Sequence, residues 1–413
     1  MRILVTGADG FAGRHLVRLL ASDPAQEVFA AGGPRTAPGP ESGGRSGDSG
    51  QVSGVVRLAL DLRDVSSVRA AVEAARPDRI YHLAAAAATF GVDAAHYMAV
   101  NAVGAHRLGQ AVLDLCGSSA RMLHVSSANV YDAAFARGRM DEQTPLGPRN
   151  EYGVSKLAAE FLLRALAGRG LDVRIARPFN HTGPGQGPGF LCPDVALRLR
   201  RALSVKARGD AEGGGGEGAV SEEPRGDGGV TYAAGIDDAR VGGVRSEEPE
   251  GDGGEIGGGG EIGGAVDDGA GAEEPQFDDA RGDGSNCGDA MGGEPRPRVR
   301  ELRIVAGRLD AIRDFCDVRD VVAAYVAMME RCPAGEVLNV CSGQGVRTGE
   351  IMEALARIAG VERLIVERDP ASRERAEHDA IVGSAQKLTD LTGWRPQIPL
   401  ERTLQDLWDS LTS

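Results

Sequence analysis

Tyr152 and Lys156, four residues apart, form the pair in this sequence that is most suited to proton chemistry. The surrounding residues 151–166 predict a helix, because apolar residues recur at helical spacing and alanine and leucine dominate. Residues four apart lie one turn from each other on the same helical face. A free phenol titrates near pH ~10, and a neighbouring ammonium lowers the pKa of a phenol toward neutrality. The pair could therefore transfer a proton, although an exposed tyrosine and lysine on a surface helix have the same spacing.

A glycine-rich turn near the start of the chain favours the chemical interpretation. Residues 2–6 predict a strand and residues 14–20 a helix, with Gly7, Gly10 and Gly13 between them. This order of strand, glycine turn and helix is typical of dinucleotide binding. Gly7 permits the tight turn, Gly10 lets a pyrophosphate approach the N–H groups of the helix N-terminus, and Gly13 lets helix and strand lie close together. We therefore expect a dinucleotide at this turn.

The end of the second predicted strand, residues 27–31, bears on the choice between NAD and NADP. In NAD-selective folds an acidic residue near this end binds the ribose 2′-hydroxyl. Here residues 32–35 read Gly-Gly-Pro-Arg and contain no carboxylate. Arg35, together with Arg14, could pair with a 2′-phosphate instead. The sequence therefore favours NADP(H), with NAD(H) as the alternative.

Candidate residues also lie at the ends of later predicted strands. Asp61 lies at the carboxyl end of the strand at 55–64, where an adenine amino group is a natural partner. Ala84 and Ala85 end the strand at 79–85, and their small side chains let a cofactor lie against the backbone. Ser127 follows the strand at 122–125; a serine there is otherwise usually a turn or capping residue. Because the carboxyl ends of parallel strands meet at one crevice, we expect these residues to line a single site.

Ser127, Tyr152 and Lys156 are the predicted catalytic residues of that site. Ser127 and Tyr152 would donate hydrogen bonds to one substrate oxygen, and Lys156 would hold the cofactor ribose and tune the phenol. The predicted cofactor contacts come from the turns and strand ends described above: Gly7, Gly10, Phe11, Gly13, Arg35, Asp61, Leu62, Leu83, Ala84 and Ala85, with Tyr152 and Lys156.

Composition excludes several other classes of protein. The net charge of −14 and the aromatic content of 4% argue against a nucleic-acid partner. No apolar run approaches the ~18 residues of a membrane span, and a strand that starts at residue 2 leaves no room for a signal peptide. The six cysteines form no metal-binding or disulfide pattern, so we expect free thiols in a reducing cytoplasm and no metal site.

Residues 208–298 differ in composition from the rest of the chain. They consist mainly of Gly, Glu and Asp, and residues 221–229 nearly recur at 246–254, with a degraded third copy that begins at 273. Such a segment cannot bury enough apolar surface to offset its ordering entropy. The sequence predicts a disordered insertion in a surface loop, which a fold tolerates at little cost.

The chain therefore reads as an α/β protein with a Rossmann, doubly wound parallel sheet. Residues 1–177 are predicted to form the dinucleotide-binding domain. Residues 178–207 and 299–413 are predicted to form a smaller substrate-binding lobe, from which some segments return to the sheet.

Taken together, the glycine turn, Ser127, the Tyr152/Lys156 pair and the sequence Gly-Trp-Arg-Pro at 393–396 resemble the extended short-chain dehydrogenases/reductases that act on nucleotide sugars. The resemblance covers residues 1–205 and 300–413. Within that family, residues 177–186, 313–321 and 339–343 are most similar to those of the reductases of GDP-4-keto-6-deoxy-D-mannose, which make GDP-D-rhamnose.

The resemblance implies a GDP-sugar substrate and a homodimer built through the helix that carries Tyr152. It implies that Tyr152 protonates the C4 oxygen while hydride reaches C4, and that Ser127 orients the carbonyl. Asn180 and Arg313 match positions that contact the diphosphate, which suits the planar fork of an arginine. Arg373 is a further candidate for the same contact.

Departures from the family pattern and alternative functions also follow from the sequence. Residues 86–88 are alanines where the family has polar side chains, Asp132 replaces a glycine, and the insertion places negative charge beside the substrate lobe. A GDP-mannose 4,6-dehydratase needs an acid/base two residues after the serine, but that position is Asn129, which cannot abstract a proton. A 4-epimerase and a non-catalytic dinucleotide-binding regulator remain as alternatives.

Overall fold

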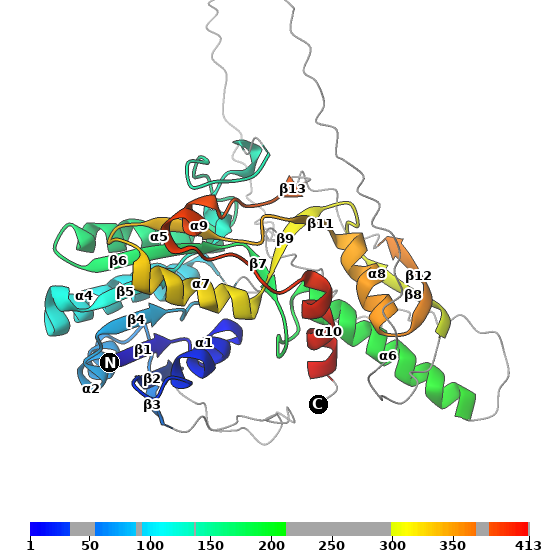
Figure 1. Cartoon of the computed structure of the whole chain (residues 1–413), viewed down its shortest axis with the longest axis horizontal. Coiled ribbons are helices and arrows are strands. Elements are labelled where there is room, and N and C mark those ends of the chain that lie inside the picture. Colours follow the sequence, from blue (N-terminus) through cyan, green and yellow to red (C-terminus); the bar gives the residue numbers. More distant parts are fainter. Residues whose placement is uncertain (34–53, 88–92, 136–137, 212–298, 369–379, 412–413) are drawn as a thin grey trace, which may run out of the picture. The chain divides into compact units, whose positions relative to one another are not determined.

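A seven-stranded parallel sheet forms the centre of the protein in the computed structural model, which describes residues 1–33, 54–87, 93–135, 138–211, 299–368 and 380–411. The strand order is β10-β6-β5-β4-β1-β2-β3, and every neighbouring pair is parallel (Figure 1). The strands are β1 (Arg2–Thr6), β2 (Glu27–Gly32), β3 (Val55–Ala59), β4 (Arg79–His82), β5 (Arg121–Val125), β6 (Asp172–Pro178) and β10 (Val337–Val340).

Helices cover both faces of this sheet. On one face α1 (Phe11–Ala21) and α7 (Val318–Arg331) share an apolar core with β1, β2 and β10, and α9 (Gln386–Thr392) packs beside α7. On the other face α2 (Val65–Ala75), α4 (Gly104–Cys116) and α5 (Glu151–Ala167) form a second core. This arrangement confirms the doubly wound α/β fold predicted from the sequence. The order of the strands reverses between β1 and β4, which is where such folds bind ligands.

The remaining elements contribute two smaller sheets and a separate apolar core. The first sheet contains β7 (Asn180–Thr182), β9 (Ile312–Asp317), β11 (Gly345–Arg347) and β13 (Ala380–Ile381), and the second pairs β8 (Val299–Ala306) with β12 (Val361–Arg368). The helices of this core are α6 (Leu191–Ala211), α8 (Thr348–Ile358) and α10 (Leu400–Ser410). Short elements elsewhere are α3 (Ala94–Tyr97), the π-helix η1 (Met98–Val103) and the 3₁₀ turns η2 (Gly117–Ser119), η3 (Ala128–Val130) and η4 (Ala133–Phe135).

The structure corrects several predicted boundaries. The third strand ends at Ala59 rather than at residue 64, so Asp61 lies in the following turn. Residues 180–182 form β7 because they pair with β9. Arg347 is the N-cap of α8, and the Thr348 hydroxyl donates to the Arg308 carbonyl oxygen at 2.6 Å. Helix α6 continues to Ala211; the rest of the predicted insertion lies outside the described residues.

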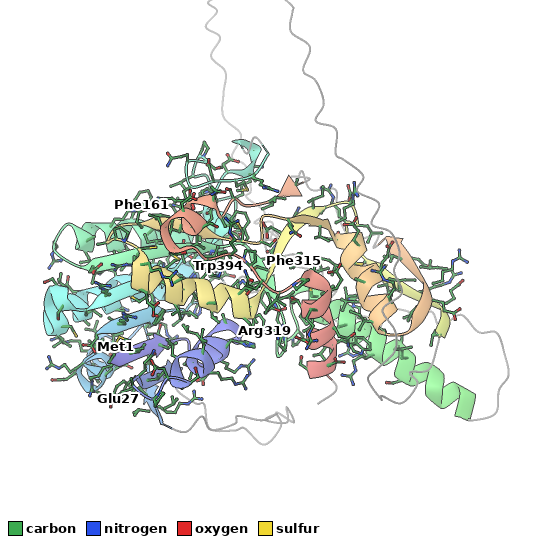
Figure 2. The ribbon with its side chains drawn as sticks, in the orientation of Figure 1. Met1, Glu27, Phe161, Phe315, Arg319 and Trp394 are labelled. Carbon is green, nitrogen blue, oxygen red and sulfur yellow. The ribbon has the colours of Figure 1, made fainter. Side chains whose placement is uncertain are left out.

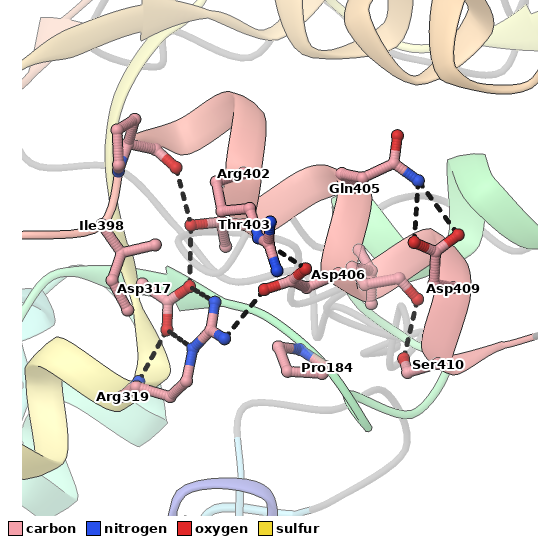
Figure 3. Close-up of polar contacts among 12 residues, drawn as sticks. Pro184, Asp317, Arg319, Ile398, Arg402, Thr403, Gln405, Asp406, Asp409 and Ser410 are labelled. Carbon is pink, nitrogen blue, oxygen red and sulfur yellow. Dashed lines mark hydrogen bonds and ion pairs between the residues drawn. The ribbon is translucent and has the colours of Figure 1, made fainter. Parts of the chain in front are cut away.

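Helix α10 is fixed to the start of α7 by a polar cluster (Figure 3). Asp317, the N-cap of α7, accepts from the Arg319 guanidinium at 2.7 and 2.9 Å and from the Thr403 hydroxyl at 2.8 Å. Arg319 also pairs with Asp406 of α10 at 2.8 Å. Ser410, at the end of α10, accepts from the backbone N–H of Gly185 at 2.9 Å. The last helix is therefore hydrogen-bonded to the loop that follows β7.

A buried ion pair ties α5 to β6. The Glu160 carboxylate is fully buried and accepts from Arg177 Nε at 2.9 Å and Nη2 at 2.6 Å. The Ser126 hydroxyl donates to the same carboxylate at 2.6 Å, and Arg164 approaches it at 3.4 Å from the helix surface. The Arg177 guanidinium also lies 4.8 Å from the centre of the Tyr131 ring. Each buried charge thus has several partners, which is the condition under which such a pair is tolerated.

We predict that Glu160→Ala lowers the free energy of unfolding by about 3–5 kcal/mol, because it leaves the Arg177 guanidinium buried without its carboxylate. Arg164→Ala is the matched control: it removes a half-exposed partner of the same carboxylate and should cost at most about 1 kcal/mol. Urea unfolding followed by circular dichroism measures both. Equal losses of unfolding free energy in the two variants would contradict a large contribution of the buried ion pair to stability.

Candidate active site

A cavity of about 300 Å³ lies at the carboxyl ends of the central strands. The glycine turn, the ends of β4, β5 and β6, the start of α5 and the segment 178–192 all line it. Of the predicted site residues it contains Gly7, Gly10, Phe11, Gly13, Leu83, Ala85, Ser127, Tyr152, Lys156 and Asn180. The structure thus brings together the glycine turn and the three predicted catalytic residues, which come from separate parts of the chain.

Tyr152 and Ser127 form the polar centre of the cavity. Tyr152 lies in the first turn of α5, whose N-cap Asn150 accepts from the backbone N–H of Gly153 at 2.7 Å. Ser127 follows β5, and its hydroxyl accepts from the backbone N–H of Asn129 at 3.2 Å. The Ser127 side chain also lies close enough to the Tyr152 phenol to act on its pKa, and both residues line the cavity. Two hydroxyl groups therefore adjoin each other at the place where a substrate carbonyl would sit.

The pKa of Tyr152 differs from the sequence expectation. Burial raises the pKa of this phenol to about 12, although the neighbouring Ser127 side chain acts to lower it. We predicted that Lys156 lowers this pKa, but the Lys156 ammonium lies 5.8 Å from the centre of the Tyr152 ring and donates to the Val125 carbonyl oxygen at 2.8 Å. The direction of the pKa shift is therefore opposite to the prediction, because desolvation of the phenol is its largest cause and the lysine charge does not contribute to it. The phenol is protonated at neutral pH and available as an acid.

Lys156 itself is buried beside the cavity. Burial lowers the pKa of its ammonium to about 8, and the carboxylate of Glu160, one turn further along α5, acts to raise it. The pKa of the folded lysine therefore lies only slightly above neutral pH, and most of the lysine is protonated at pH 7. The buried Glu160 carboxylate acts in favour of the charged form.

Two buried histidines lie next to Lys156 on the central strands. His82 and His124 are cross-strand neighbours on β4 and β5, with ring centres 5.3 Å apart. The Thr6 hydroxyl and His82 Nδ1 are hydrogen-bonded at 2.7 Å. Burial, aided by the charge of Lys156, lowers the pKa of His82 to about 3 and that of His124 well below its ordinary value. Both rings are neutral at pH 7 and add no positive charge near the lysine.

Asn101 and Asn129 are further polar residues of this region. Asn101, in the π-helix η1, accepts from the Ala86 N–H at 2.7 Å and donates to the Ala86 carbonyl at 3.2 Å and to Ser155 at 3.0 Å. It therefore holds the segment after β4 against α5. Sequence reasoning assigned no role to Asn101. Single-turn π-helices often mark functional sites, but the structure alone reveals this one. Asn129, at the position where dehydratases carry an acid, lies in the cavity lining.

The glycine turn has the geometry of a dinucleotide cradle. Gly7 has φ +70°, and a Cβ there would lie 2.6 Å from the backbone nitrogen of Ala84. A Cβ on Gly13 would lie 2.0 Å from the carbonyl oxygen of Gly7. Gly10 is the N-cap of α1, so the N–H groups of the first helical turn open toward the cavity. The Phe11 ring stacks on His181 with ring centres 5.9 Å apart. These residues fit a pyrophosphate at the helix N-terminus.

Other predicted cofactor residues lie outside the cavity lining. The Asp61 carboxylate is bound by the Arg63 guanidinium at 2.9 and 3.0 Å, and these bonds lower the pKa of Asp61. Leu62 is buried in the core beside α4, and Ala84 packs against Gly7. Arg35 lies outside the described residues.

Only one of the three predicted substrate-binding residues lines the cavity in the described structure. Asn180 begins β7 and lines the cavity. Arg313 is only 1% exposed, lies in the middle of the small sheet and donates to the Ile312 carbonyl oxygen at 2.9 Å; it does not line the cavity. Arg373 lies outside the described residues. Asp132, the replacement for a family glycine, pairs with Arg149 at 3.0 Å at the surface.

Within the described part of the chain, no group of three His, Cys, Asp or Glu residues is arranged to hold a metal ion. The five cysteines described there, Cys116, Cys192, Cys316, Cys332 and Cys341, are free thiols. None of the helices in the described ranges is both long and apolar enough to cross a membrane.

We predict that the stability of the ligand-free protein rises between pH 8 and 10 relative to that of Lys156→Met. The unfolded lysine holds its proton up to 10.5, whereas the folded one releases it near 8. The unfolded state then binds more protons in this window, so the free energy of unfolding increases with pH. The titrations of the tyrosines are common to both proteins and cancel. A difference in Tm or urea midpoint that stays flat from pH 7 to 10 would contradict the lowered pKa.

Comparison with known proteins agrees with this geometry. The model of the NAD dependent epimerase/dehydratase family matches residues 3–217, and the GDP-mannose 4,6 dehydratase model matches residues 298–407. The chain is 29% identical over 341 residues to GDP-6-deoxy-D-mannose reductase of Pseudomonas aeruginosa, with 81% of each chain covered. It is 31% identical over 196 residues to GDP-6-deoxy-D-talose 4-dehydrogenase of Aggregatibacter actinomycetemcomitans, with 47% of this chain and 58% of the relative covered.

The chain is also similar to a solved structure. The structure of RMD from Pseudomonas aeruginosa complexed with NADPH is 26% identical, with a TM-score of 0.63 over 99% of this chain and 98% of that one. Because the first family model matches more than half of the chain, the protein belongs to the NAD-dependent epimerase/dehydratase family of NAD(P)-dependent enzymes that act on nucleotide sugars.

Proposed function

We propose that the protein reduces the C4 ketone of GDP-4-keto-6-deoxy-D-mannose to give GDP-D-rhamnose, with NAD(P)H as the reductant. The observation that carries this proposal is that Ser127, Tyr152 and Lys156 line one cavity together with the glycine turn. The similarity to a GDP-6-deoxy-D-mannose reductase over 81% of the chain supports the choice of substrate.

The proposed roles follow from the positions of the side chains. The bound nicotinamide supplies the hydride to C4. Tyr152, protonated at neutral pH, donates its proton to the C4 oxygen, and Ser127 donates a hydrogen bond that orients the same oxygen. Lys156 places a positive charge near the phenolate that forms and stabilises it. Asn180 contacts the diphosphate of the substrate from β7. For Arg313, the same contact requires a rearrangement that exposes its guanidinium.

The cavity disfavours a dehydratase. Removal of water across C5 and C6 needs a base for the C5 proton, and the position that would carry it is occupied by Asn129. A neutral amide cannot accept that proton. A 4-epimerase uses the same serine, tyrosine and lysine, so these residues do not exclude that reaction.

The proposal also specifies the configuration of the product at C4. GDP-6-deoxy-D-mannose and GDP-6-deoxy-D-talose differ only in the configuration at C4, and relatives named for each sugar match this chain. The reductase match spans 81% of the chain, whereas the talose dehydrogenase match spans 47%. We therefore propose the rhamnose product.

We further propose that the protein is a homodimer joined through α5. Val154 and Phe161, two turns apart on one face of α5, are 46% and 56% exposed, and Met98 and Val103 of the adjoining η1 are 37% and 39% exposed. Phe161 is labelled in Figure 2. A group of exposed apolar side chains on neighbouring helices is typical of a protein–protein interface. A second copy of the same face would cover it.

The reaction is tested with GDP-4-keto-6-deoxy-D-mannose and either NADPH or NADH. We expect reduced nicotinamide to be consumed and NMR of the product to give GDP-D-rhamnose. Tyr152→Phe should lower kcat by about 10²–10⁴-fold because it removes the proton donor, with cofactor affinity largely unchanged. GDP-6-deoxy-D-talose as the product would overturn the assigned configuration. Full activity of Tyr152→Phe would remove the tyrosine from the mechanism.

The dimer is tested by light scattering after size-exclusion chromatography. Phe161→Glu should convert the wild-type dimer to a monomer, because it places a charge at the centre of the apolar face. Leu19→Glu is the control: Leu19 is 42% exposed on α1, on the other side of the sheet. A wild-type monomer, or a dimer that survives Phe161→Glu, would exclude this interface.

A further inference from the structure

A carboxylate lies at the carboxyl end of β2, although the residues of β2 at that end carry none. It belongs to Asp9, in the glycine turn, whose Oδ2 lies 1.9 Å from the point where a Cβ on Gly32 would be. The Asp9 side chain thus occupies the space that a side chain of residue 32 would fill. The absence of a side chain at Gly32 is what allows the carboxylate to sit there.

Arg57 holds this carboxylate in place. Arg57 extends from β3, the edge strand next to β2, and its Nη1 donates to Asp9 Oδ1 at 2.5 Å. Both side chains are more than half exposed, so the ion pair adds little to stability. Its effect is positional: Arg57 binds Oδ1, and Oδ2 is directed at Gly32.

The end of β2 is where a doubly wound fold meets the adenosine ribose of a dinucleotide. An acidic group there accepts a hydrogen bond from the 2′-hydroxyl of NAD(H), whereas it repels the 2′-phosphate of NADP(H). Two other charged groups of this edge are occupied within the protein. Asp61 is bound by Arg63, and Arg14 donates to the Gly185 carbonyl oxygen at 2.9 Å.

We propose that Asp9 reads the 2′ position of the adenosine ribose and makes the protein bind NAD(H) more tightly than NADP(H), with Arg57 as its positioning residue. The inference rests on the use of a dinucleotide in the proposed function. It differs from the NADP(H) preference that the sequence predicts, because that prediction sought the acidic group only among residues 32–35. Asp9 reaches the same place from the turn after β1.

The test is the ratio of Kd values for NADPH and NADH, measured by isothermal titration calorimetry on the full chain. The wild type should bind NADH more tightly, by about tenfold or more, since a carboxylate beside a phosphate dianion costs at least ~1.4 kcal/mol. Asp9→Ser should shift the ratio toward NADPH by about the same factor, because it removes the repulsion and frees the Arg57 guanidinium for the phosphate.

Gly32→Ala provides a second variant that keeps every charge. Its new Cβ would force the Asp9 side chain to turn away, so the ratio should shift in the same direction as in Asp9→Ser. Gly33→Ala is the matched control, since no atom lies within 4 Å of a Cβ at that position, and its ratio should equal that of the wild type.

The proposal is overturned if the wild type binds NADPH more tightly, or if neither Asp9→Ser nor Gly32→Ala changes the ratio. A loss of NADPH binding on Arg35→Ala, with no effect of Asp9→Ser, would instead support the sequence prediction. These titrations need no sugar nucleotide. A protein that prefers NADH but leaves GDP-4-keto-6-deoxy-D-mannose unreduced would therefore overturn the proposed reaction and keep this inference.

Discussion

The buried pair of Glu160 and Arg177 is the interaction on which the geometry of the active site depends. Tyr152, Lys156 and Glu160 follow one another at intervals of four residues, so they lie along one face of α5. Glu160 fixes that face to β6 through Arg177 and to the end of β5 through Ser126. The same carboxylate acts to raise the pKa of Lys156, which burial lowers. One anchored carboxylate therefore sets the direction of the helix and supports the charge of its lysine.

Much of the fold could be predicted from the sequence, because its signals are local. Apolar runs identified β1, β2, β3, β4 and β5 of the parallel sheet, and the helical spacing of apolar residues such as Leu157 and Phe161 identified α5. The pairing of β7 with β9 could not be predicted in the same way. Residues 180–182 form a strand only because residues 315–317, more than a hundred positions later, supply the partner. Strand formation of that kind depends on tertiary context.

The candidate site was predictable to the extent that its residues follow strands. Ser127 and the glycine turn lie where the order of strands and turns placed them, and they meet in one cavity. The pKa of Tyr152 was not predictable, because it depends on how completely the fold removes water from the phenol. Asp9 was also missed. Its carboxylate reaches the end of β2 through space, and only the coordinates reveal that Gly32 leaves room for it.

Helix α1, which follows the glycine turn, is hydrogen-bonded to the loop after β7. His15, in the first turns of α1, is hydrogen-bonded through Nε2 to the Pro184 carbonyl oxygen at 2.9 Å, and Arg14 binds the next carbonyl, that of Gly185. The N–H of Gly185 in turn donates to Ser410 of α10. A displacement of this loop must therefore break hydrogen bonds to the cofactor helix and to the last helix together. The loop at 183–186 therefore contacts α1 and directly follows β7. We infer that a ligand bound at the glycine turn and a ligand bound at β7 would each restrict the position of this loop.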